Sequence, residues 1–389
     1  MKITKIEAIP LIYPYEKPIF DASFCAAHRQ AVLVKVSTDE NIVGWGEAAS
    51  FGGPPQITTT VIEEEIAPLI INENPLNIEK IWKKVYHRSY QHARGGLVIC
   101  ALSGVDIALW DIRAKYAKLP LYQLLGGYRD RVKAYASGGF YKEGEKTEDL
   151  AIAMKSYVDR GYQAVKVKVG RNHTPLNPIE LMPHPEIAWT LEEDCQRVEA
   201  VRKAIGPDIQ LIVDANAAWD AHTALMMGRR FEELGVYAFE EPISTDDIAG
   251  SAYLSEKLDI KIAGYETEQR LFGFRNLIAH RCVGMIQPDL TWAGGITECR
   301  KIAAFAQAYN ISCSPHCFSS CVAVAASLHF LGSIPNGEFL EMDQNPNGLR
   351  TELIKEPIEI DRDGYVPILD KPGLGVEPLE DVMKKYEVK

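Results

Sequence analysis

The sequence lacks any apolar run of the roughly 18 residues that a membrane-spanning helix needs. Its opening, MKITKIEAIPLIYPY, has no apolar core of a secretion signal and carries Glu7 and Pro10 early. Positive charge is not in excess either, since 42 Lys and Arg stand against 53 Asp and Glu, a formal net charge of -11. These absences argue against a membrane partner and against nucleic-acid binding by bulk electrostatics, and they predict a cytoplasmic protein. An anionic small substrate stays open, because a local group of lysines and a metal can outweigh the global charge.

Paired cysteines are missing as well. None of the eight cysteines forms a CxxC pair, so we expect buried free thiols in a reducing compartment in preference to a zinc site or disulfides. Cys313, Cys317 and Cys321 are spaced by four, which suggests metal ligands, but Pro315 interrupts any helix through them.

Two regions of different pattern divide the 389 residues, a length that fits a large barrel with an accessory domain. Residues 1–130 open with alternating strand-like runs and end in a helical segment closed by Gly126-Gly127, which predicts an α+β domain. Residues 131–370 repeat a short apolar strand, a loop and an amphipathic helix. Residues 371–389 form a C-terminal segment that we expect to pack back on the first domain.

Eight strands are expected in the second region. The candidates are VKAYAS, YQAVKVKV, IQLIVDAN, YAFEEP, IKIAGYE, VGMIQPD, ISCSPH and EFLEMD. Eight parallel strands separated by helices predict a closed α/β barrel, since an open sheet of that width would be unusual. Residues 171–191 break the rhythm, because they are too long and proline-rich for an ordinary strand-to-helix connection. We interpret them as a surface insertion, with an active-site lid as the alternative.

Polar residues stand where these strands end, which is the face at which barrel enzymes carry their chemistry. From the second strand to the eighth, the strands end in Lys166 and Lys168, Asp214 and Asn216, Glu240 and Glu241, Glu266, Asp289, His316 and Glu341. Seven consecutive strands therefore end in ionisable groups, which is the strongest functional signal in the sequence.

The acids of this set predict a metal site. Asp214, Glu240 and Glu266 end three successive strands, and neighbouring strands lie about 4.8 Å apart, so the three carboxylates can converge. Unpaired, they would raise one another's pKa, and a hard cation removes that cost. Oxygen ligands without nearby His or Cys favour Mg²⁺ or Mn²⁺ over zinc, whereas one such Asp alone would more often cap a helix. Glu241 precedes a proline and is expected to point elsewhere, and Asn216 is a candidate substrate or outer contact.

Lys166 and Lys168 lie two residues apart on one strand, so both enter the same side of the barrel. Taken alone, VKVKV is typical of an amphipathic strand with one wet face. Inside a barrel the pair instead points towards the carboxylates. We expect like charge and the nearby cation to depress the pKa of Lys168, which makes it a base near pH 7, while Lys166 stays charged and holds a substrate oxygen.

Asp289 and His316 end neighbouring strands, so the carboxylate can orient the imidazole and support its charged form. The other eight histidines, such as His329, are interpreted as structural. Glu341 lies on the adjacent strand. We expect burial to keep it protonated, so that it can donate a hydrogen bond to a substrate oxyanion.

An ordered set of motifs resembles the enolase superfamily, in the subgroup named for mandelate racemase. The first region carries SGVDIALWDIRAKYAKLPLYQLLGG. The second carries KVKVG, VDAN, FEEP, the Glu of IAGYE, QPDLTWAGGIT, SPH and the Glu of FLEMD. The resemblance covers nearly the whole chain. Two departures are Tyr265, where the family more often has Gly directly before the Glu, and the long segment after KVKVG.

The resemblance implies a modified TIM barrel, (β/α)7β, capped by the α+β domain. It implies metal ligation by Asp214, Glu240 and Glu266, Lys168 as the base on one face of the substrate carbon and the His316–Asp289 dyad on the other. Glu341 would stabilise the enediolate and Lys166 would contact the carboxylate. Loops of the capping domain, here about residues 17–29 and 50–55, would close over the substrate, and a homo-oligomer would be usual.

Such a site removes the proton next to a carboxylate, with one divalent cation offsetting the developing charge. Lys as base with a His–Asp dyad resembles acid-sugar dehydratases, so we favour dehydration of a sugar acid to a 2-keto-3-deoxy acid. The C-terminal stretch resembles cycloisomerases of aldaric lactones or anhydro-sugar acids, and racemisation or epimerisation is a third outcome. The candidate substrate contacts are Asn216, His28, Arg29, Asp21, Tyr141 and Trp292.

Two other classes of protein fit less well. A carbohydrate-binding protein would normally be secreted. A two-metal barrel hydrolase would need several His ligands at strand ends, and only His316 qualifies.

Overall fold

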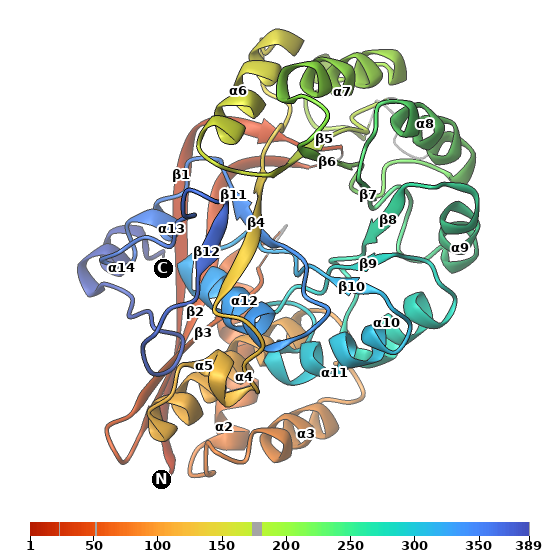
Figure 1. Cartoon of the computed structure of the whole chain (residues 1–389). Helices are drawn as coiled ribbons and strands as arrows, with labels where there is room; N and C mark the ends of the chain where they lie inside the picture. The colour runs from red at the N-terminus through yellow and green to blue at the C-terminus, as the bar shows by residue number, and fades with distance from the viewer. Residues whose placement is uncertain (23, 51–52, 173–180, 389) are drawn as a thin grey trace.

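The structure is a computed structural model that describes residues 1–22, 24–50, 53–172 and 181–388. An antiparallel capping sheet and a barrel of parallel strands make up the molecule (Figure 1). Ser23, part of the predicted loop 50–55 and part of the segment 171–191 lie outside the described residues. The alternative between insertion and lid is therefore left as a prediction.

The capping domain is built on a three-stranded sheet in the order β1-β2-β3. Its elements are β1 (Ile3–Phe20), β2 (Cys25–Thr38), β3 (Val43–Ala48), α1 (Pro55–Thr60), the π-helical turn η1 (Val61–Ile66), α2 (Ala67–Ile70), α3 (Ile78–Arg88), α4 (Leu97–Ala117) and α5 (Leu121–Leu124). The predicted loop 17–29 is mostly β-structure, because β1 and β2 extend into it and leave only residues 21–24 between them.

Helix α4 packs directly on β3 because β3 carries glycine where the two backbones meet. A Cβ atom on Gly46 would collide with the backbone carbonyl of Gly104 in α4, and one on Gly44 would collide with that of Ala108. Only glycine permits this approach. The contact holds β3 against the helix, and with it the buried carboxylate of Glu47, which follows Gly46.

The barrel confirms the predicted fold. Its eight strands are β4 (Arg131–Ser137), β5 (Ala164–Lys168), β6 (Gln210–Asp214), β7 (Ala238–Glu240), β8 (Lys261–Gly264), β9 (Met285–Ile286), β10 (Ser312–Cys313) and β11 (Leu340–Asp343). Neighbours pair in parallel in the order β10-β9-β8-β7-β6-β5-β4-β11. A parallel bridge between Cys313 and Gly337 brings the two ends of this sheet together.

Among the described residues, seven α-helices connect the eight strands, as (β/α)7β requires. They are α6 (Thr147–Asp159), α7 (Leu191–Ile205), α8 (Ala221–Glu233), α9 (Ile248–Lys257), α10 (Arg270–Ala279), α11 (Gly295–Gln307) and α12 (Cys321–Ser333). The short helices η2 (Pro185–Ile187) and α13 (Gly348–Thr351) lie in connecting segments. Figure 1 shows α6 to α11 around the outside of the strands.

The interior of the barrel is packed beneath the polar strand ends. One buried cluster combines small and large side chains, as layers inside such barrels do. It consists of Tyr135, Ala164, Ile212, Ala238, Ala263, Met285 and Phe339. Lys166 follows Ala164 by two residues and Glu240 follows Ala238 by two, so both point inwards one layer above this apolar floor.

The C-terminal segment contacts the capping domain. Strand β12 (Tyr365–Pro367) pairs antiparallel with β4, and α14 (Glu380–Tyr386) follows it. The backbone N–H of Val388 donates to the carbonyl of Pro10 in β1. The rings of Tyr386 and Tyr13 meet edge to face, with centroids 5.5 Å apart. The contacts of Val388 and Tyr386 place the end of the chain on β1. The boundaries 1–130, 131–370 and 371–389 stay a prediction.

All eight cysteines lie in described residues, and all are free thiols. Seven are buried and Cys25 is partly buried, which agrees with the interpretation from sequence. Among the described helices, none combines the length and the apolar character that crossing a membrane requires.

His329 is structural, as predicted. It lies buried in α12, where Nδ1 accepts a hydrogen bond from the N–H of Tyr122 at 3.2 Å and Nε2 donates to the carbonyl of Leu374 at 3.0 Å. Burial lowers the pKa of His329 from 6.5 to about 4, against the opposing effect of Leu374. The ring is therefore neutral in the folded protein between these two pH values but charged in the unfolded chain.

The stability that neutral His329 contributes is complete above pH 6.5 and is lost as the pH falls through about 4. This pKa difference corresponds to on the order of 3 kcal/mol in the free energy of unfolding. Urea unfolding at a series of pH values should show a steeper loss on acidification in the wild type than in His329→Gln. Equal pH dependence in the two proteins would contradict this assignment.

Candidate active site

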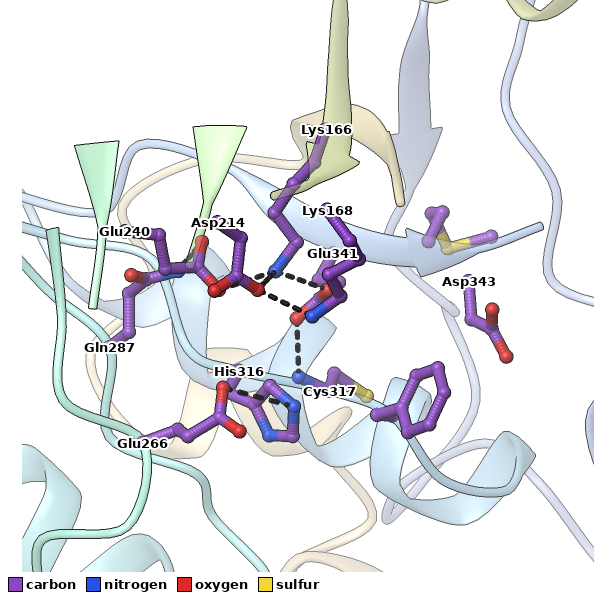
Figure 2. Close-up of polar contacts among 12 residues, drawn as sticks. Lys166, Lys168, Asp214, Glu240, Glu266, Gln287, His316, Cys317, Glu341 and Asp343 are labelled. Carbon is purple, nitrogen blue, oxygen red and sulfur yellow. Dashed lines mark hydrogen bonds and ion pairs between the residues drawn. The ribbon is translucent and has the colours of Figure 1, made fainter. Parts of the chain in front are cut away.

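The polar strand ends converge on one space inside the barrel mouth (Figure 2). Lys166 and Lys168 are on β5, Asp214 ends β6, Glu240 ends β7, Glu266 follows β8, Asp289 follows β9, His316 follows β10 and Glu341 is on β11. All of them are buried apart from Glu266, whose side chain is 15% exposed. The geometry thus brings together every residue predicted to take part in catalysis or metal binding.

The two lysines reach between the carboxylates. The Nζ atom of Lys166 lies 2.5 Å from Glu240, 2.9 Å from Glu341 and 3.6 Å from Asp214. The Nζ atom of Lys168 lies 2.5 Å from Asp214. Burial lowers the pKa of Lys166, but Glu240 and Glu341 outweigh it and hold that pKa well above its usual range.

The low pKa expected for Lys168 depends on a nearby cation and stays a prediction, and the contact with Asp214 opposes it. Burial lowers it, but the adjacent Asp214 carboxylate raises it more, with Lys166 opposing, and the net pKa is above the ordinary value. The sequence indicated the like-charged neighbour but not the direct contact between Lys168 and Asp214. If Asp214 coordinated a cation, Lys168 would lose the partner that raises its pKa.

The carboxylate cluster carries more negative charge than its lysines compensate. Burial and the neighbouring Asp214 raise the pKa of Glu240 to about 8 despite contact with Lys166. Burial also raises the pKa of Glu266, with Asp214 adding to it and His316 opposing. Of the three predicted metal ligands, only Asp214, which lies between two lysines, has a lowered pKa, because Lys168 and Lys166 outweigh its burial.

The donor set fits a hard cation. Within the described ranges, no three His, Cys, Asp or Glu side chains are already arranged around a common metal position. The reason is visible in the ion pairs, since ammonium groups take the positions between the carboxylates. Two amide oxygens next to the cluster, Asn216 Oδ1 and Gln287 Oε1, are buried without a hydrogen-bond partner. Carboxylate and amide oxygens of this kind match Mg²⁺ or Mn²⁺.

Glu241 corrects one prediction. It does not point away, since its carboxylate accepts a hydrogen bond from the N–H of Glu266 at 3.0 Å. Burial raises its pKa well above the usual range, with Glu266 and Asp214 adding to the effect. Its backbone φ of 39° turns the chain so that two successive glutamates face one cluster, which alternation along a strand does not predict. Asn216 lies close by, where its N–H donates to Asp214 Oδ1 at 2.9 Å.

The predicted dyad is formed. Nδ1 of His316 lies 2.7 Å from Asp289 Oδ2, and the N–H and hydroxyl of Thr291 both donate to Asp289 Oδ1 at 2.6 Å. Nε2 of His316 faces Glu266 Oε2 at 3.4 Å. Burial lowers the pKa of His316, but Glu266 and Asp289 more than offset it and raise the pKa to about 10. The ring is therefore an imidazolium at neutral pH, suited to act as an acid.

Glu341 is ionised, contrary to the expectation that burial keeps it protonated. Burial does raise its pKa, but Lys166 and His316 reverse the effect and hold the pKa far below its usual range. Its carboxylate also accepts a hydrogen bond from the N–H of Cys317 at 2.9 Å. Glu341 therefore accepts hydrogen bonds here, from the N–H of Cys317 and from Lys166.

The predicted substrate contacts lie at different depths. Asn216, Asp21 and Trp292 are partly buried, whereas His28 is exposed, with Nε2 3.2 Å from Gln30 Oε1. Tyr141 is a correction, because it is wholly buried and its hydroxyl donates to Asp194 Oδ1 at 2.6 Å. Its side chain has no exposed surface with which to contact a substrate.

Arg29 is buried and paired with Asp343, its Nη2 lying 2.6 Å from Asp343 Oδ2. Its guanidinium covers the ring of Phe318 at 3.1 Å from the centroid. The Phe318 ring in turn stacks on Phe140, with centroids 5.3 Å apart. A guanidinium of the cap thus packs on two stacked aromatic rings of the barrel, and the nearer ring, Phe318, lies 6.4 Å from the ring of His316.

Four residues of the site were missed from the sequence. Gln287 donates from Nε2 to Glu240 Oε2 at 2.8 Å, and its position two residues before Asp289 was a usable signal, because such residues share a strand face. Asp343 carried the same signal, because it lies two residues after Glu341 on β11. Phe140 and Phe318 carried no comparable signal. They join the site through contacts between segments that are distant in sequence.

The fold is a (β/α)7β barrel with an α+β cap. The site has two lysines on the second barrel strand, acids on successive strands and an Asp–His dyad. Together these features define an enolase-like enzyme. The chain matches the "Enolase C-terminal domain-like" model over residues 149–382 and the "Mandelate racemase / muconate lactonizing enzyme, N-terminal domain" model over residues 7–126. It belongs to the mandelate racemase/muconate lactonizing enzyme family of the enolase superfamily. Members of this superfamily bind a divalent metal.

Relatives include enzymes of sugar acids. The chain is 37% identical to an arabinonate dehydratase of Saccharolobus solfataricus over 360 residues, which cover 92% of this chain and 91% of the relative. It is 32% identical to a D-galactarolactone cycloisomerase of Agrobacterium fabrum, covering 100% and 99%. A racemase from Streptomyces coelicolor, solved with bound magnesium, has a TM-score of 0.88 and 27% identity, covering 99% and 100%.

Proposed function

We propose that this protein is a Mg²⁺-dependent sugar-acid dehydratase, with Mn²⁺ as a substitute ion, that forms a 2-keto-3-deoxy acid. The observation that carries the proposal is that a strand lysine, Lys168, and His316 meet around one carboxylate cluster (Figure 2). His316 is held in a dyad by Asp289. A base and an acid that reach the same space from different strands can remove a proton and protonate a leaving hydroxide on one substrate. The relatives that act on arabinonate and galactarolactone favour a polyhydroxylated acid.

Asp214, Glu240 and Glu266 would hold the cation, which supplies positive charge to offset the second negative charge that develops on the substrate carboxylate. Lys168, once neutral, takes the proton from the carbon next to that carboxylate, and the C–H electrons become the enediolate. Lys166 stays charged between Glu240 and Glu341 and stabilises an enediolate oxygen. As the enediolate collapses, the C–O bond to the neighbouring hydroxyl breaks, and His316 gives that oxygen its proton to form water. The resulting enol becomes the 2-keto-3-deoxy acid.

Cycloisomerisation is the second candidate, because the galactarolactone relative aligns over the whole chain. The same acid and base would then serve ring opening or closure, and epimerisation would result if the proton returned to the other face. Proton NMR of the protein with Mg²⁺ and a panel of aldonates, aldarates and their lactones in D₂O separates these reactions. A keto-deoxy product supports dehydration, an isomeric lactone or opened ring supports cycloisomerisation, and α-deuteration without water loss supports epimerisation. No reaction and no exchange with any acid would contradict the proposal.

Removing the metal is expected to abolish turnover. A cation that supplies several kcal/mol of charge stabilisation corresponds to a loss of about 1000-fold or more after chelation, restored by Mg²⁺. Asp214→Asn should also lose Mg²⁺ binding in isothermal titration calorimetry, because it removes the carboxylate that faces both lysines. Asp220→Asn is a matched control, since Asp220 only caps α8 by accepting from Thr223. Unchanged Mg²⁺ binding in Asp214→Asn would contradict the ligand assignment.

A further inference from the structure

The loop that carries the catalytic histidine is anchored at every residue. It runs from His316 to Ser320, between β10 and α12. The anchoring contacts are His316 to Asp289 at 2.7 Å, the Cys317 N–H to Glu341 at 2.9 Å, the Phe318 carbonyl to Arg29 at 3.3 Å, the Ser319 carbonyl to Asn347 at 3.0 Å and the Ser320 N–H to Glu47 at 3.1 Å. Two of these partners, Arg29 and Glu47, belong to strands of the capping domain. The cap therefore contacts the loop that carries His316, whose imidazole lies inside the barrel.

Glu47 makes the most complete of these contacts. Its side chain is buried, and its two oxygens accept from the N–H of Ser320 at 3.1 Å, the hydroxyl of Ser320 at 2.5 Å and the N–H of Ala323 at 3.0 Å. These donors belong to the first turn of α12, where backbone N–H groups are otherwise unsatisfied. A carboxylate there is also favoured by the helix dipole. Burial raises the pKa of Glu47 to about 7, with the hydrogen bonds from Ser320 and Ala323 opposing. The start of α12 is thus fixed by a carboxyl group on β3.

Only three residues separate Ser320 from His316. In so short a segment, a shift at Ser320 passes along the backbone to the histidine, while Asp289 fixes only one ring nitrogen. Lys168 is on β5, where its Nζ contacts Asp214 and lies 5.0 Å from the centroid of the Phe140 ring, so its position is set by the barrel. A defect at Glu47 should therefore displace the acid and leave the base in place.

We propose that Glu47 is a positioning residue for the proton donation by His316, acting through the His316–Ser320 loop. The inference rests on the proposed function, in which Lys168 removes the α proton and His316 protonates the leaving hydroxyl. On this inference, removal of the α proton and protonation of the leaving hydroxyl depend on different domains. The barrel strand alone positions the base, whereas the cap positions the acid.

Glu47→Gln tests the inference. The amide keeps the shape of the side chain, but it replaces one oxygen by an NH₂ group, which cannot accept hydrogen bonds from Ser320 or Ala323. With the acid that the wild type dehydrates, water loss is expected to fall about 100-fold, the cost typical of a small misplacement. Exchange of the α proton for solvent deuterium, which needs only Lys168, should stay close to the wild-type rate. Proton NMR in D₂O measures both rates in one sample. A parallel fall of both rates would overturn the inference and leave the proposed function standing.

Two further variants keep the test decisive. Ser320→Ala removes one donor and keeps the carboxyl group of Glu47. It should show the same selective decrease in the rate of water loss, by a smaller factor, even if Glu47→Gln folds poorly. Asp111→Asn is the matched control, because Asp111 is also a buried acid of the cap and accepts from the N–H groups of Trp45 and Leu374, away from the loop. It should leave the ratio of the two rates unchanged. If the ratio of α-proton exchange to water loss were equal in Ser320→Ala and the wild type, the inference would be contradicted. A wild type that shows neither exchange nor water loss would overturn both the proposed function and this inference.

Discussion

Lys168→Ala is expected to lose both α-proton exchange and turnover, by about 100- to 10,000-fold, which is the usual contribution of a positioned base. Lys168 lies at the end of β5 with Nζ 2.5 Å from Asp214, so it stands beside the predicted metal ligand and the substrate carboxylate that the metal would hold. No other lysine except Lys166 reaches this cluster among the described residues, and Lys166 is enclosed by carboxylates. The rates of deuterium incorporation and of product formation can be followed by proton NMR.

Lys261→Ala provides the control for this substitution. Lys261 is also a barrel lysine, but it begins β8 at the opposite end of the strands, where it pairs with Glu338 at 3.0 Å. Its removal should leave α-proton exchange close to that of the wild type. If Lys168→Ala still exchanged the α proton at the wild-type rate, the base would have to be another group.

Asp343→Ala is expected to destabilise the protein by about 3–5 kcal/mol, because it leaves the charge of Arg29 buried without its partner. Both side chains are 2% exposed, and the pair joins β2 of the cap to β11 of the barrel at 2.6 Å. Asp343 also accepts from the N–H and side-chain amide of Asn345 at 3.0 and 2.6 Å, so the substitution loses hydrogen bonds as well. Denaturant unfolding measures the loss as a change in the midpoint.

The double variant Arg29→Met with Asp343→Leu tests the cause. It removes both charges and keeps apolar bulk beside Phe318, so it should regain a large part of the lost stability. The difference between the double variant and the sum of the single ones gives the coupling of the pair. Strictly additive losses would show that the two charges do not stabilise each other.

The fold could be predicted because each barrel strand is short, apolar and followed by an amphipathic helix, and this order leaves few alternatives to a closed barrel. The positions of Asp214, Glu240 and Glu266 followed in the same way, since successive parallel strands place their ends side by side. The dyad followed from two neighbouring strands. These predictions need only local pattern and strand order.

Protonation states could not be predicted, because they depend on distances of a few ångströms. Glu341 was expected to be neutral through burial, but Lys166 at 2.9 Å reverses that effect. Lys168 was expected to have a low pKa, but its direct contact with Asp214 raises it. A sequence shows which charges are neighbours in order but not which of them touch.

Contacts between the cap and the barrel were equally hidden. Arg29 and Asp343 are 314 residues apart, and Glu47 and Ser320 are 273 apart. Arg29 was identified as a residue of the site, but its partner was not. Tyr141 was predicted to contact the substrate, yet it is buried and its hydroxyl donates to Asp194. Such pairings depend on how two domains fit together.

The central claim is that the proton next to the carboxylate leaves the substrate, and a substrate deuterated at that carbon tests it most directly. The protein would be incubated with Mg²⁺ and this labelled acid in ordinary water, and the label followed by deuterium NMR. Proton abstraction by Lys168 predicts slower turnover than with the unlabelled acid and release of the label into the solvent. A product that keeps the label, formed at the same rate as from the unlabelled acid, would contradict the account.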